Sequence, residues 1–161
     1  MRKFLFVLTI VFLVFSTSPI YAGTPDQAAG EWRYIISDFD MKEVGGNSIM
    51  TTFDEGLRTG TFEGVSTEVG KMVIHRTGKR FFIGRLTFDG EVDGKPGTFR
   101  MFVVGRKLVD QDWTGHWVIL SRSEELANLH GRGIWFGPGA GCPFVWGTVA
   151  YKENYHFGPG K

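Results

Sequence analysis

The chain has 161 residues, with 18 lysines and arginines, 17 aspartates and glutamates, and one cysteine. Charge this close to neutral gives no basic surface for nucleic acid or anionic lipid, and one cysteine excludes an internal disulfide framework. Chains of about 150 residues bury close to 70% of their unfolded surface, so one domain of this length forms a core without cross-links.

The N-terminal segment has the pattern of a secretory signal peptide. Arg2 and Lys3 precede an apolar run, residues 4–15, and a short Ser/Thr/Pro segment follows it. The run is shorter than the roughly 20 residues that a membrane-spanning helix needs. We therefore expect cleavage after Ala22, which removes residues 1–22. Residues 23–161 are expected to form one exported domain, periplasmic or extracellular, with no membrane span. A retained N-terminal anchor is the alternative. Loss of Arg2 and Lys3 leaves 16 basic against 17 acidic residues, a net charge of −1.

Alternating apolar and polar residues predict about eight β-strands. The clearest is 81–92, where Phe82, Leu86 and Phe88 share one face and Arg85 lies on the other. Residues 93–97 (DGKPG) then supply turn chemistry for a hairpin. In chain order, the predicted strands are 31–39, 58–64, 65–76, 81–92, 98–106, 113–120, 131–136 and 144–151, and residues 121–128 predict one short helical turn.

Glycines recur inside these strands and in the short connections between them. Glycine relieves crowding where a strongly coiled strand bends, so the pattern favours an all-β fold, a small closed antiparallel barrel of about eight strands. A β-sandwich is the alternative.

Glycine, aromatic and leucine residues recur in a fixed order over most of the chain after residue 80: Gly84, Phe88, Gly90, Gly94, Gly97, Thr98, Phe99, Trp117, Val118, Leu126, Leu129, Gly131 and Gly133. This order resembles a bacterial family of domains of unknown function with an allene oxide cyclase-like, calycin-like β-barrel. The resemblance implies that Leu126 and Leu129 plug one end of the barrel, while Gly131 and Gly133 begin the next strand in a crowded bend; an ordinary surface turn is the alternative. The chain departs from the family at the charged segment 121–125.

Acidic residues in strands are the candidates for acid catalysis, since burial of a carboxyl raises its pKa. Asp38 shares strand parity with Trp32 and Tyr34, which would place it at the rim of a cavity. Glu63 is the second weak candidate, although it and Glu68 alternate with apolar neighbours and are expected to face solvent. The histidines have no metal-ligand spacing. We expect neither a metal nor a cofactor.

Aromatic residues on the predicted inward faces are the candidates for ligand binding. A barrel of about eight strands holds either a packed core or one small ligand, and we expect Gly90 and Gly115 to leave space between the rings. The predicted function is an exported barrel that binds a small apolar or aromatic molecule. The alternatives are a cyclase or isomerase that acts by enclosing an apolar substrate, and a structural or interaction barrel with a filled core; homo-oligomers are compatible with each. The candidate ligand-binding residues are Trp32, Tyr34, Phe62, Phe88, Phe99, Trp113, Trp117 and Trp135.

Overall fold

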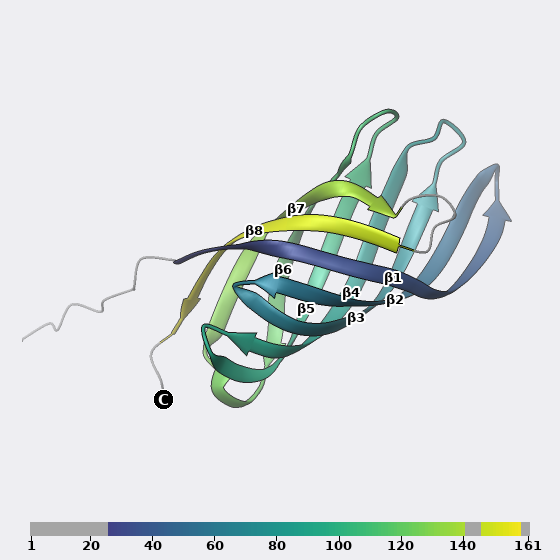
Figure 1. Cartoon of the computed structure of the whole chain (residues 1–161). Helices are drawn as coiled ribbons and strands as arrows, with labels where there is room; N and C mark the ends of the chain where they lie inside the picture. The colour runs from purple at the N-terminus through teal and green to yellow at the C-terminus, as the bar shows by residue number, and fades with distance from the viewer. Residues whose placement is uncertain (1–25, 141–145, 159–161) are drawn as a thin grey trace, which may run out of the picture.

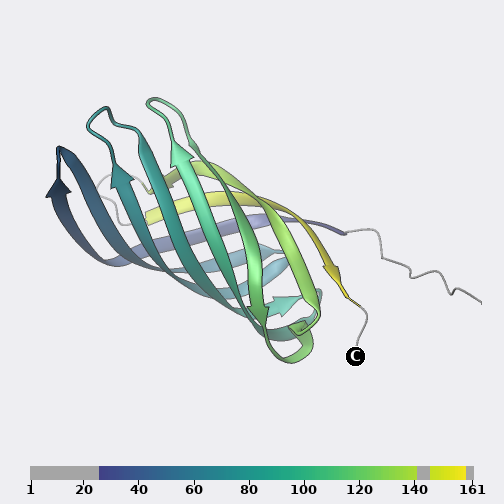
Figure 2. The same cartoon turned by 180° about the vertical axis from the view of Figure 1, so that it is seen from behind.

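The computed structural model describes residues 26–140 and 146–158. Each strand pairs with the next one in the chain, and β1 also pairs with β8, so the antiparallel strands form a closed barrel. The strands run obliquely around it (Figures 1 and 2). The predicted all-β, antiparallel fold is confirmed, whereas the predicted signal peptide lies outside the described residues. The elements are β1 (Asp26–Val44), β2 (Asn47–Gly60), β3 (Phe62–Ile74), β4 (Arg80–Val92), β5 (Lys95–Lys107), β6 (Trp113–Arg122), the short 3-10 helix η1 (Glu124–Leu126), β7 (Leu129–Ala140) and β8 (Trp146–Phe157).

The strand predicted at 58–64 is wrong, because these residues span the turn between β2 and β3. Gly60 has a φ of +97°, a backbone conformation that L side chains rarely adopt, and the chain reverses there. Most of β2 was not predicted, since its polar residues face inward and hide the usual alternation.

One end of the barrel is filled. Phe62 is completely buried at the centre of an aromatic cluster, packed on Phe99 at 5.3 Å and stacked on Tyr151 at 5.6 Å between ring centroids. Burial of a phenylalanine side chain contributes about 1.5–3 kcal/mol. Leu126 of η1 and Leu129 of β7 are fully buried in the same core, as the resemblance implied. This closed end also holds the first residues of β1 and the last of β8, which pair with each other.

Gly115 does not leave an empty space, contrary to the prediction. The indole ring of Trp135 lies against Gly115 and Gly105, and its Nε1 donates a hydrogen bond of 3.0 Å to the Val104 carbonyl. Gly90 is filled in the same way, by the Phe88 ring and the neighbouring strand. Aromatic rings and neighbouring backbone therefore occupy the space beside these glycines, and the glycines add no cavity volume.

Candidate functional site

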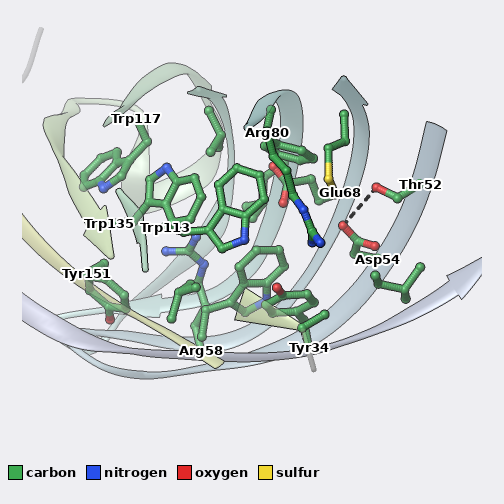
Figure 3. Close-up of a pocket in the computed structure, with 18 of the residues that line it drawn as sticks. Tyr34, Thr52, Asp54, Arg58, Glu68, Arg80, Trp113, Trp117, Trp135 and Tyr151 are labelled. Carbon is green, nitrogen blue, oxygen red and sulfur yellow. Dashed lines mark hydrogen bonds between the residues drawn. The ribbon is translucent and has the colours of Figure 1, made fainter. Parts of the chain in front are cut away.

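An interior pocket lies at the other end of the barrel, towards the β1–β2, β3–β4 and β5–β6 turns. Its cavity volume is about 70 Å³, which is room for several water molecules or for the leading atoms of a larger ligand. Side chains from many strands converge on it (Figure 3).

Aromatic rings form much of the pocket wall. Trp32 and Tyr34 of β1 stack with ring centroids 4.4 Å apart, and Trp113 and Trp135 lie 5.8 Å apart across β6 and β7. Gly56 of β2 accommodates the indole edge of Trp32, because an added Cβ would lie 2.5 Å from Trp32 Nε1. Rings fixed in this way present apolar surface without losing further side-chain freedom when a ligand binds.

Two buried carboxyl groups interrupt this aromatic wall. Asp54 of β2 and Glu68 of β3 are direct partners in the antiparallel register, and their side chains are 4% and 1% exposed. Thr52 donates a hydrogen bond of 3.2 Å to Asp54 Oδ2. In the described part of the chain, Asp54 Oδ1 and Glu68 Oε1 are buried without a hydrogen-bond partner. The pocket thus contains two unsatisfied acceptor atoms that a ligand with donor groups would satisfy. Its wall also contains two buried donors without a partner among the described residues, Nε1 of Trp32 and Nε1 of Trp117.

Burial makes both groups weak acids. Desolvation raises the pKa of Asp54 to about 7, although the Thr52 hydrogen bond opposes the rise. Desolvation also raises the pKa of Glu68 to about 8, the negative charge of Asp54 adds to this rise, and the positive charge of Arg58 lowers it. Near neutral pH the pair therefore exchanges protons with a bound molecule or with water at little cost in free energy.

Arg58 supplies a buried positive charge in the pocket wall. Its guanidinium lies 5.6 Å from the Trp32 ring centroid and 5.2 Å from that of Tyr151, and its Nη2 lies 3.6 Å from Met101 Sδ. The aromatic wall therefore already stabilises one cation. Tyr34 stays protonated, because burial and the charges of the two carboxylates raise its pKa.

The predicted ligand-binding residues divide between the two ends of the barrel. Trp32, Tyr34, Trp113, Trp117 and Trp135 line the pocket. Three predicted residues do not line it: Phe62, Phe88 and Phe99 are packed in the filled core. Alternation identified the inward face of each strand, but it carries no information about depth along the barrel axis.

The weak catalytic candidates lie outside the pocket. Asp38 is exposed, like every residue of β1 from Ser37 to Val44. The register between β1 and β2 also shifts between Ile36 and Asp38, which ends the parity shared with Trp32. Glu63 is exposed on the outer face of β3. The expected outward orientation of Glu68 is wrong. Glu68 follows Glu63 by five residues in a regular strand, and side chains an odd number of residues apart point to opposite faces, so Glu68 points inward. Counting from Phe62 would have placed Glu68 inward, while Asp54 and Arg58 were missed with β2.

The described residues contain no group of three or more histidine, cysteine, aspartate or glutamate side chains placed to hold a metal ion. Within 26–140 and 146–158, no helix is long and apolar enough to cross a membrane.

Comparisons with known proteins show the fold alone. No family model matches the chain, and no curated protein is significantly similar to it. The chain is similar to a crystal structure of a protein of unknown function from the DUF3224 family of Shewanella oneidensis MR-1, with a TM-score of 0.64 and 17% sequence identity. The match covers 84% of this chain and 99% of that protein. It supports the predicted likeness to a bacterial family of domains of unknown function.

Proposed function

We propose that the protein is an exported barrel of the allene oxide cyclase-like, calycin-like type that binds a small molecule with an apolar or aromatic part in its interior pocket. The observation that carries this proposal is the open cavity between Trp32, Tyr34, Trp113 and Trp135 at one end of an otherwise filled barrel. Concave sites walled by rings and holding a few polar groups are typical of small-molecule binding.

Fluorescence titration with flat apolar probes tests the proposal. The residues that line the pocket include Trp32, Trp113 and Trp135. A bound probe is therefore expected to quench tryptophan emission in a saturable way. Ala140→Phe places a ring in the pocket, where Ala140 lines the wall and is half-buried, and it is expected to abolish quenching while the barrel stays folded. Ala150→Phe, at a half-buried position of β8 that does not line the pocket, is the matched control. Unchanged quenching in Ala140→Phe would refute binding at this site.

A cyclase or isomerase that acts by enclosure is the second candidate, and the buried carboxyl groups favour it. Glu68 and Asp54 lie beside the cavity with pKa values near neutrality, which suits a proton donor and acceptor. Incubation with an unsaturated fatty-acid epoxide, followed by chiral analysis of the products, tests this reaction. Stereoselective product from the parent and racemic product from Glu68→Gln is the expected result for an enzyme.

A further inference from the structure

We propose that the ligand of the interior pocket is a small organic cation, a protonated amine attached to an aromatic or apolar group, whose ammonium group lies between Asp54 and Glu68. This inference rests on the proposed binding function and adds the chemical class of the ligand.

The first support is the geometry of the unsatisfied acceptors. Asp54 and Glu68 are cross-strand partners, and directly opposed side chains have Cβ atoms roughly 4.5–5.5 Å apart. Both are more than nine-tenths buried, both line the cavity, and each has one buried oxygen without a partner among the described residues. An ammonium group offers three donors and no acceptor, and so complements two such oxygens.

The second support is the charge inside the barrel. Arg58 is the buried cation among the described residues that line the pocket, and its positive charge lowers the pKa of Glu68. Arg80, which also lines the pocket, is only half-buried, and no ion pair joins it to a carboxylate within the described residues. When both carboxyl groups are ionised, they attract a ligand with one positive charge and repel an anionic ligand.

The third support is the chemistry of the walls. Aromatic faces attract cations, and the pocket shows this already, since Arg58 lies over the rings of Trp32 and Tyr151. Trp113 and Trp135 extend the aromatic surface and offer stacking surface to the remainder of an amine ligand.

Binding of a cation favours the ionised form of both carboxyl groups and therefore releases protons. The other charged or titratable groups that line the pocket are Tyr34 of β1, Arg58 of β2, Arg80 of β4 and Tyr151 of β8; the described lining residues of β5, β6 and β7 include none. Affinity for an amine is expected to rise from pH 5 to pH 8, as Asp54 and Glu68 lose their protons, while affinity for a neutral analogue stays constant.

The test compares benzylamine, benzyl alcohol and benzoate by isothermal titration calorimetry at pH 7 with the full processed chain. Benzylamine is expected to bind at least tenfold more tightly than benzyl alcohol, and benzoate least tightly. Repeating the benzylamine titration in buffers with different ionisation enthalpies is expected to show net proton release. Glu68→Gln and Asp54→Asn should each remove the tenfold preference without weakening benzyl alcohol, whereas Glu55→Gln, an exposed neighbour on β2, should keep it.

The possible failures are distinguishable. If benzyl alcohol or benzoate binds as tightly as benzylamine, the cation inference is overturned and the proposed binding function stands. If none of the three binds, both are overturned. If either variant fails to fold, the proton release and the pH dependence of the parent decide alone, and their absence overturns the inference.

Discussion

Asp54 and Glu68 lie opposite each other on β2 and β3, and both side chains point into the barrel, where they are almost completely buried. Two carboxyl groups this close in a poorly solvated interior cannot both ionise as easily as they would in water. The protein therefore keeps at its pocket a pair of acids that ionise only near neutral pH.

This pair makes stability depend on pH. The ordinary pKa values are 3.8 for Asp54 and 4.5 for Glu68, and folding raises them to about 7 and about 8. Between these limits the folded state binds more protons than the unfolded state, so the free energy of unfolding falls as pH rises from about 4 to about 8, and it is flat above this range. Each pKa rises by about three, and because one pKa unit corresponds to about 1.4 kcal/mol, the loss is on the order of 4 kcal/mol for each group.

Glu68→Gln removes one of the two titrating groups. The melting temperature of this variant relative to the parent is expected to increase steadily from pH 5 to pH 8, as measured by thermal melts in buffers of constant ionic strength. Glu63→Gln, at an exposed position on the same strand, should track the parent at every pH. A Glu68→Gln curve parallel to that of the parent would mean that Glu68 is ionised normally.

Gly133 is expected to tolerate no side chain. A Cβ there would collide with the Lys152 carbonyl and lie 2.6 Å from the Trp117 ring, and overpacking of this kind costs roughly 1–3 kcal/mol. Gly133→Val should therefore lower the denaturation midpoint clearly. Gly131→Ala should cost less, because the nearest atom is the flexible end of Ile119, 3.0 Å away. Asn128→Ala serves as the control, and equal midpoints for all three would place the segment in an ordinary exposed turn.

Gly115→Leu is expected to unfold the barrel rather than to fill a cavity. Its side chain would collide with the Val104 carbonyl and with the Trp135 indole, and so break the hydrogen bond between them. Near-ultraviolet circular dichroism should show loss of the tryptophan signal, whereas Thr114→Leu on the exposed face should retain it. A folded Gly115→Leu protein would show that the Trp135 ring has another position available.

Tyr151 is expected to stabilise the turn between β2 and β3 through its hydroxyl group. This group donates a hydrogen bond of 2.8 Å to the Thr59 carbonyl and accepts one of 3.1 Å from the Phe62 backbone N–H. Tyr151→Phe leaves that buried N–H without this acceptor, which costs about 1–3 kcal/mol. Urea unfolding measures the difference, with Thr148→Ala on the exposed face of β8 as reference. Equal unfolding free energies would show that the hydrogen bonds contribute nothing net.

The export prediction is checked by the intact mass of the secreted protein. A chain that begins at Gly23, or within two residues of it, is expected, because Arg2, Lys3 and the apolar run have the sequence pattern of a cleavable signal peptide. An unprocessed chain in the membrane fraction would instead favour a retained anchor.

Sequence alternation predicted the fold where the inward residues are apolar. On β4 the buried Leu86, Phe88 and Val92 alternate with exposed polar residues, so the strand and its inward face followed directly. On β3 the exposed Val65 and Val69 alternate with the buried Ser66 and Glu68, which reverses the usual pattern. The site was therefore hidden for a physical reason: this pocket has polar groups at positions where a packed core has apolar ones.

The pairing register between neighbouring strands could not be predicted from the sequence either. The irregularity between Ile36 and Asp38 moves every later residue of β1 to the other face, and no alternation pattern reveals it. The pairing of Asp54 with Glu68 likewise depends on where the chain turns between β2 and β3. The aromatic half of the pocket and the inward face of Glu68 were predictable from strand parity, whereas Asp54 and Arg58 required the structure of β2.

Identification of the small molecules that the protein retains decides whether the interior pocket holds a ligand. The purified protein is incubated with a periplasmic extract of its source, separated from unbound material, and its small molecules are analysed by mass spectrometry, in parallel with Ala140→Phe. A compound that is enriched on the parent protein and absent from the variant is the expected result. No enriched compound, or the same compound in equal amount on both proteins, would contradict it.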